Sequence, residues 1–232
     1  MTKTNRTLLL HQHEAQALVA GRLEMFWRPV KSQPGKVQSG DWCFFKNNSI
    51  YATETAYSEN ALLRKMMKHC PYGQPGDLLV GKETWRECTD QLGIMYRADG
   101  WEDVQANYNL KWRSSATMPR RASRFTLRVV SVGVERVGNI SEEDAKTSGA
   151  NHVIPAAILH KFDPVPLIGY RAGFKLEWDE IYANPRPVRH KGEIVHYESY
   201  PFSGEARTEE YQGKLWHIWP NPFAWRVKVE AV

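Results

Sequence analysis

The sequence has few cysteines, and their spacing suits neither a disulfide framework nor a zinc site. Cys43, Cys70 and Cys88 are the only three, with no Cys-x-x-Cys pair, which is typical of reduced thiols in a cytoplasmic protein. None of the eight histidines is spaced with these cysteines as a zinc site requires. We therefore expect a cytoplasmic protein without a bound metal.

Long apolar runs and nucleotide-binding loops are also missing. No segment approaches the roughly 20 apolar residues of a membrane span, and the first residues, MTKTNRTLLLHQHE, have too short an apolar core for a signal peptide. Gly169 and Gly173 in GYRAGF lack the strand-turn-helix setting of a phosphate loop. No nucleophile motif indicates a catalytic triad. We expect neither membrane association nor a cofactor.

Tryptophan and positive charge are what the chain does contain. Nine of its 232 residues are tryptophan and 12% are aromatic, which favours a β-rich fold or a surface that stacks planar ligands. Lysine and arginine outnumber aspartate and glutamate by 31 to 26, a net charge of +5. This balance permits a nucleic-acid partner without requiring one.

Local patterns predict a mixed α/β chain in which strands dominate. Helices are expected over 14–20, after Ser58, after Ser141 with its acidic first turn, and in FKLEWDEIYA. The alternation that starts at Phe125 slips by one residue near Val130, which predicts a β-bulge, and NPFAWRVKV reads as a half-buried closing strand. We expect one domain over 1–232, with an irregular proline-rich insertion at about 163–213.

The strongest charge imbalance lies between residues 111 and 128. This stretch holds six basic residues and no acidic one. One interpretation is a charged strand edge that prevents edge-to-edge pairing. The other is phosphate contact by arginine forks, helped by a serine hydroxyl. The basic residues are Lys111, Arg113, Arg120, Arg121, Arg124 and Arg128, and the serine is Ser123.

The order of several short motifs resembles the phage-type ASCH domain, a branch of the PUA-like superfamily. The motifs are LVAGR, Arg28-Pro29, PYGQPGDLLVGKETW, KWRSSATMPRRASRFTLRV, VERVGNISEEDA, LEWDEIY and NPFAWRVKV. They follow the family's order through most of the chain, excluding the proline-rich insertion. The resemblance implies a small β-barrel flanked by helices, with a cleft between the first helix and the barrel that binds RNA or a modified nucleoside.

The family resemblance favours the phosphate-binding interpretation and places a nucleic-acid site in a basic cleft. For Glu83 the alternative is a buried carboxylate paired with an arginine, and for Trp85 it is a core position. The predicted site residues are Arg22, Arg28, Lys82, Glu83, Trp85, Arg120, Arg121, Ser123 and Arg124.

The chain departs from the family's amidohydrolase pattern at three positions. Leu23 stands where the pattern has a catalytic lysine, Phe26 where it has a threonine, and Ser148 where it has a glutamate. Without an amine and a carboxylate, that hydrolytic mechanism lacks its catalytic groups. We therefore predict binding of RNA, single-stranded DNA or a nucleotide without catalysis. Two alternatives stay open: a divergent amidohydrolase or ribonuclease that uses Glu24 or Glu83, and a phage protein that contacts a host protein.

Overall fold

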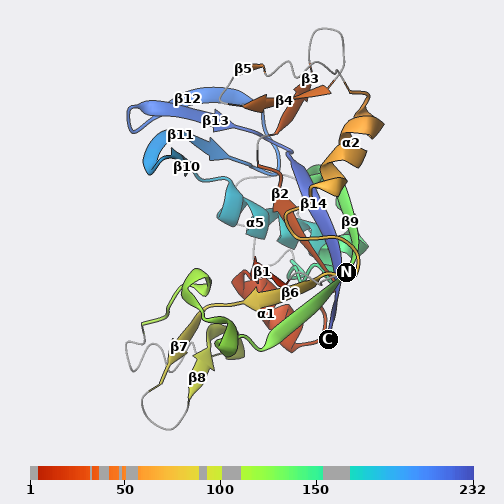
Figure 1. Cartoon of the computed structure of the whole chain (residues 1–232), viewed down its shortest axis with the longest axis vertical. Helices are drawn as coiled ribbons and strands as arrows, with labels where there is room; N and C mark the ends of the chain where they lie inside the picture. Colours follow the sequence, from red (N-terminus) through yellow and green to blue (C-terminus); the bar gives the residue numbers. More distant parts are fainter. Residues whose placement is uncertain are drawn as a thin grey trace.

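The computed structural model describes residues 5–31, 33–36, 42–46, 49–50, 57–88, 93–100, 111–153 and 168–232. It is a mixed α/β fold in which strands predominate, as the sequence predicts (Figure 1). None of the described helices is long and apolar enough to cross a membrane. The helices are α1 (Gln12–Val19), α2 (Glu59–Lys68), α4 (Glu142–Thr147) and α5 (Tyr170–Tyr182), with 3₁₀ turns η1 (Arg97–Asp99), η2 (Ser115–Thr117), η3 (Arg120–Ala122) and η4 (Val137–Asn139). The strands are β1 (Asn5–Leu9), β2 (Met25–Pro29), β3 (Pro34–Lys36), β4 (Trp42–Lys46), β5 (Ser49–Ile50), β6 (Leu78–Lys82), β7 (Trp85–Glu87), β8 (Ile94–Tyr96), β9 (Phe125–Arg136), β10 (Arg186–His190), β11 (Glu193–Ser199), β12 (Arg207–Tyr211), β13 (Lys214–Ile218) and β14 (Phe223–Ala231).

A five-stranded sheet in the order β1-β6-β9-β14-β2 forms the centre of the molecule. β1 and β6 are parallel, and the other neighbours are antiparallel. One face packs against α1 and α2, where Phe26 and Leu62 are fully buried. The other face packs against α4 and α5, where Trp27 meets Phe174. Because both faces are covered, successive residues of β2 are buried instead of alternating.

The central sheet is open, so the predicted small β-barrel is wrong for the described strands. Its edge strands β1 and β2 are not paired with each other. In place of a backbone ladder, the Arg28 guanidinium on β2 donates a 2.9 Å hydrogen bond to the carbonyl oxygen of Leu9, at the end of β1. A barrel would require main-chain pairing between those edges.

Several local predictions are confirmed. Lys228 and Val229 of β14 pair with Ser131 and Val129 of β9, so Val130 is the extra residue of a bulge. The Ser141 hydroxyl accepts a hydrogen bond from the amide of Asp144 and begins α4. α2 begins directly after Ser58. α1 begins two residues earlier than the pattern indicated.

The insertion is more regular than its prolines suggested. α5 forms where predicted, and β10 to β13 make a four-stranded sheet in the order β10-β11-β13-β12. Pro187 lies on the edge strand β10, the part of a sheet in which proline is found. β12 is exposed along most of its length, so neither edge strand carries the alternation that would have revealed it. Residues 163–167 of the predicted insertion lie outside the described residues.

Candidate functional site

The arginine-rich stretch Lys111–Arg124, here called the basic segment, is fixed to the hairpin of β7 and β8. The backbone of Arg113 exchanges two hydrogen bonds with that of Trp85, of 3.2 and 2.8 Å. Met118 and Ala122 are buried against the same tryptophan. These contacts join the segment to the hairpin at Arg113, Met118 and Ala122.

Five basic residues of this segment are exposed, namely Lys111, Arg113, Arg120, Arg121 and Arg124. The segment contains no acidic residue of its own. Arg113 is paired loosely with Glu87 of β7, at 3.8 Å, and both side chains are more than half exposed. Such an exposed pair is weak, so the face carries net positive charge into solvent.

Arg124 has a different environment, because it is bound to two carboxylates. Its guanidinium makes hydrogen bonds of 2.8 and 3.1 Å to Glu83 and of 2.6 Å to Asp99. Glu83 is 1% exposed. Burial raises the pKa of Glu83, and the hydrogen bonds from Arg124 oppose that rise. The structure therefore realises the alternative expected from the sequence, a buried glutamate paired with an arginine.

The side chains of two further predicted site residues, Ser123 and Trp85, make structural contacts within the fold. The Ser123 hydroxyl donates a 2.6 Å hydrogen bond to the carbonyl oxygen of Gly81 on β6. Trp85 is 2% exposed and belongs to the small core under the basic segment, as the core alternative supposed. Both side chains therefore help to hold the basic segment in place and are not available to bind a ligand.

The remaining predicted residues are dispersed. Lys82 is half-buried at the end of β6, beside Glu83. Arg22 is exposed in the turn after α1, and no contact between described residues joins its side chain to the basic segment. Arg28 is buried elsewhere, against α1. The nine predicted residues thus do not form the single basic cleft that the sequence suggested.

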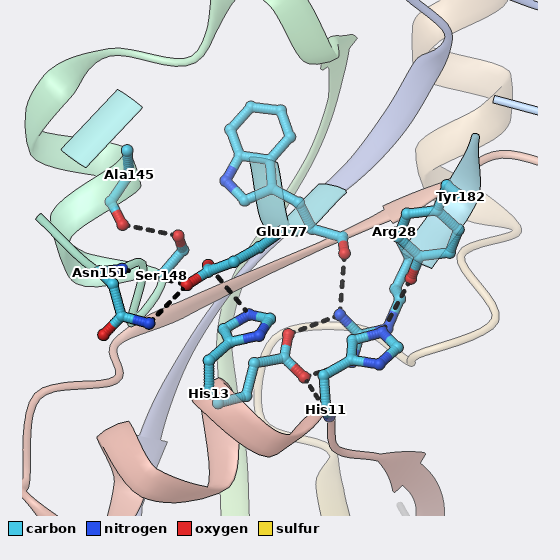
Figure 2. A network of polar contacts seen from close by, with 10 residues as sticks. His11, His13, Arg28, Ala145, Ser148, Asn151, Glu177 and Tyr182 are labelled. Carbon is cyan, nitrogen blue, oxygen red and sulfur yellow. Dashed lines mark hydrogen bonds and ion pairs between the residues drawn. The ribbon is translucent and has the colours of Figure 1, made fainter. Parts of the chain in front are cut away.

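Arg28 belongs to a polar pocket between α1, β2, α4 and α5, here called the α1–α5 pocket (Figure 2). Its guanidinium binds both carboxylate oxygens of Glu14, at 2.6 and 2.7 Å. Burial opposes ionisation of Glu14, but Arg28 outweighs it and holds the pKa of that carboxyl at about 2. The Arg28 and Glu14 side chains are 9% and 4% exposed, so this ion pair is shielded from solvent and has a structural role.

The histidines of HQHE, near the start of the chain, face the same pocket. The His11 ring nitrogen Nε2 lies 3.0 Å from the Tyr182 hydroxyl of α5. Burial, with the nearby charge of Arg28, lowers the pKa of His11 to about 3. His13 Nε2 lies 3.7 Å from Glu177 Oε2, and Figure 2 shows these two side chains pointing toward one another.

Glu177 is anchored by one of its two oxygens. Its Oε1 accepts hydrogen bonds from the backbone amide and side-chain amide of Asn151, at 3.2 and 2.8 Å. Burial raises the pKa of Glu177. The cavity beside it has a volume of about 20 Å³, enough for roughly one water-sized group.

The three positions that differ from the amidohydrolase pattern are all buried. Leu23 and Phe26 lie in the core on the α1 side of the sheet. Ser148 lines the α1–α5 pocket and is 3% exposed. Its hydroxyl donates a 2.7 Å hydrogen bond to the carbonyl oxygen of Ala145.

Sequence reasoning did not find this pocket. Its signal was HQHE, in which an acidic residue, Glu14, takes a helix position flanked by the buried Ala15 and Ala17. A carboxylate on a buried helix face requires a partner. That partner is Arg28, which is predicted above to lie in the nucleic-acid cleft.

Comparison with known proteins finds no match: no family model, no curated protein and no solved structure matches this chain. Its resemblance to ASCH domains therefore stays a prediction. Within the described parts of the chain, no group of three or more histidine, cysteine, aspartate or glutamate side chains could hold a metal ion.

Proposed function

We propose that this protein binds nucleic acid, RNA in preference to DNA, through the exposed face of the basic segment, and does not hydrolyse it. The observation that carries the proposal is a segment without acidic residues that is joined to the β7–β8 hairpin and presents Lys111, Arg113, Arg120 and Arg121 to solvent. Such residues bind phosphates by charge and by parallel hydrogen bonds.

The neighbouring residues support this role by positioning the segment. Arg124 is neutralised by Glu83 and Asp99, so it fixes the start of β9 and adds no free charge. Its guanidinium also lies 4.1 Å from the ring centre of Tyr96 on β8. Arg124 thereby connects the start of β9 with Tyr96 of β8 and with Asp99 of the 3₁₀ turn η1. Holding the segment in this way lowers the entropy lost on binding.

The preference for RNA, and the absence of hydrolysis, rest on the ASCH resemblance. An ASCH domain of the PUA-like type, encoded by a phage and acting in the host cytoplasm, is part of the same proposal, and its support is the order of motifs along the chain. The buried Leu23, Phe26 and Ser148 supply neither an amine nor a carboxylate at the hydrolytic positions.

The binding surface is tested by measuring the affinity of a short single-stranded RNA, and of the matching DNA, as salt is varied. Each phosphate contact contributes about −0.7 to the slope of log affinity against log salt. Lys111→Ala and Arg121→Ala should each flatten the slope by roughly that amount, with stability changed by only about 0.5 kcal/mol.

Arg64→Ala is the matched control, because it removes an exposed arginine from α2, at the opposite end of the long axis of the molecule from β7 and β8 (Figure 1). It should change the slope far less than Arg121→Ala. If both segment variants keep the parent's slope, the basic segment is a charged edge and the proposal fails. Arg124→Ala is unsuitable, since it would strand the buried Glu83.

The enzyme alternative is tested separately, by following acetate release from an acetylated cytidine nucleoside. We expect no release above background. Turnover that disappears in Glu24→Ala would establish an enzyme in place of a binding protein. Failure to bind any nucleic acid, together with specific capture of a host protein, would instead favour the protein-contact alternative.

A further inference from the structure

Two polar atoms buried at the α1–α5 pocket have no hydrogen-bond partner among the described residues. One is the indole Nε1 of Trp27, a residue that is 2% exposed. The other is Glu177 Oε2, whose nearest basic neighbour, His13 Nε2, lies at 3.7 Å, beyond hydrogen-bonding distance. By contrast, the indole of Trp178 in the same pocket donates a 2.6 Å bond to the carbonyl oxygen of Tyr200.

One of these unpaired atoms is a hydrogen-bond donor and the other is an acceptor, and both belong to residues of the same pocket. A buried polar group left unpaired is destabilising, and native folds rarely leave such groups unsatisfied. Trp27 Nε1–H requires an acceptor, and the Glu177 carboxylate oxygen requires a donor. Since both residues line the same cavity, one group that carries an acceptor and a donor would satisfy both.

The charges around the cavity limit what that group can be. The Arg28 guanidinium is committed to Glu14 and to the carbonyl oxygens of Trp27 and Leu9, so it cannot neutralise an incoming anion. The Glu177 carboxylate would repel one. A cation would pair with Glu177 but would leave the Trp27 N–H facing a positive charge. A neutral group avoids both penalties.

The walls and the volume define its size. Phe174 and Trp178 of α5 are stacked with ring centres 5.7 Å apart, and Ile181 adds further apolar surface. The cavity of about 20 Å³ has room for roughly one water-sized group, so only the polar head of a ligand can enter it and a larger apolar body has to stay outside. Small-molecule sites commonly combine apolar walls with a few placed polar groups.

We propose that the α1–α5 pocket binds a small molecule through a neutral head that carries a hydrogen-bond acceptor and donor, either a primary amide or a hydroxyl, attached to an apolar body. The head accepts a hydrogen bond from Trp27 Nε1 and donates one to Glu177 Oε2. This site is separate from the basic segment, so either proposal can fail without the other.

Four probes of similar shape test the head group: benzamide, benzyl alcohol, benzoate and benzamidinium. Binding is followed in ¹⁵N-labelled full-length protein by the indole N–H resonance of Trp27, which is assigned by its loss in Trp27→Phe. We expect a neutral probe to shift this resonance and to bind more tightly than either charged probe. Benzamide as the better ligand identifies an amide head, and benzyl alcohol identifies a hydroxyl head.

Two substitutions test the two hydrogen bonds. Trp27→Phe should lower the affinity for the preferred neutral probe by about tenfold, which is the effect of one lost hydrogen bond. Glu177→Gln should narrow the discrimination against benzoate, because the repelling charge is removed. Trp216→Phe is the matched control, since that indole already donates to the Ser199 hydroxyl on the insertion sheet, and it should leave binding unchanged.

The outcomes that overturn the proposal are equally specific. If no probe shifts the Trp27 resonance, the cavity holds only water. If benzoate or benzamidinium binds as tightly as the neutral probes, the donor–acceptor assignment is wrong. Should Trp27→Phe fail to fold, the resonance shift in the parent protein and the Glu177→Gln selectivity still decide the matter.

Discussion

Replacing Arg28 with methionine should destabilise the protein by about 3–5 kcal/mol, because it leaves the Glu14 carboxylate buried without its counter-ion. The two side chains are 9% and 4% exposed and are joined by two hydrogen bonds of 2.6 and 2.7 Å. Arg28 also donates to the carbonyl oxygens of Trp27 and Leu9, at 2.8 and 2.9 Å. The variant therefore strands one charge and two carbonyl oxygens.

The size of the coupling follows from the same geometry. Glu14→Leu alone strands the guanidinium and should cost a similar amount. The double variant removes both charges and leaves an apolar contact, so its cost should be well below the sum of the single costs. We expect a coupling energy of at least about 2 kcal/mol, from a double-mutant cycle measured by urea unfolding.

Arg207→Met provides the matched control for this cycle. Arg207 pairs with Glu209 on the insertion sheet, but those side chains are 55% and 42% exposed. Its loss should change the free energy of unfolding by no more than about 0.5 kcal/mol. The description of Glu14 and Arg28 as a buried, coupled ion pair would be refuted by either of two results. One is that the losses in free energy of unfolding are additive in the cycle, and the other is that Arg28→Met and Arg207→Met have equal effects.

Two further predictions concern stability. The pKa of His11 falls from 6.5 to about 3 on folding, so below pH 6.5 the unfolded state binds a proton that the folded state does not. Stability should therefore fall by about 1.4 kcal/mol per pH unit from this group as the pH drops below 6.5 toward 3. His11→Asn, which keeps a good N-cap, should remove that component of the slope between pH 6.5 and 5, and parallel unfolding profiles would contradict the assignment. Trp225 is 7% exposed on β14, so Trp225→Ala should cost about 3–5 kcal/mol in thermal or urea unfolding, and an unchanged melting temperature would be incompatible with its core position.

Some elements follow from short-range patterns, and these were predictable. The β-bulge at Val130 appears in the sequence as a slip in alternation, since side chains on a strand repeat every two residues. The N-cap at Ser141 and the acidic turn that follows it define the start of α4 from four consecutive residues. The burial of Phe223, Trp225 and Val227 follows from the same alternation.

The sheet of the insertion could not be recognised in this way. β10 and β12 are edge strands whose side chains are mostly exposed, so no hydrophobic period marks them. The open sheet was equally hidden, because β1 and β2 lie at its two ends and Leu9 and Arg28, which contact each other, are far apart in the chain. Both features depend on how distant strands come together.

The sequence by itself determined the strand-dominant α/β class, the main local boundaries and the position of the acid-free basic segment, because each depends on residues within a few positions of one another. Only the tertiary structure decided which charges are free. It buried Arg28 against Glu14, it paired the partly exposed Arg124 with the buried Glu83, and it left Arg121 exposed. It also brought His11 to Tyr182, 171 positions away, to form a pocket that no local pattern encodes. Burial and pairing are properties of neighbours in space, and a charged side chain far from its partner in the chain looks the same as one that has none.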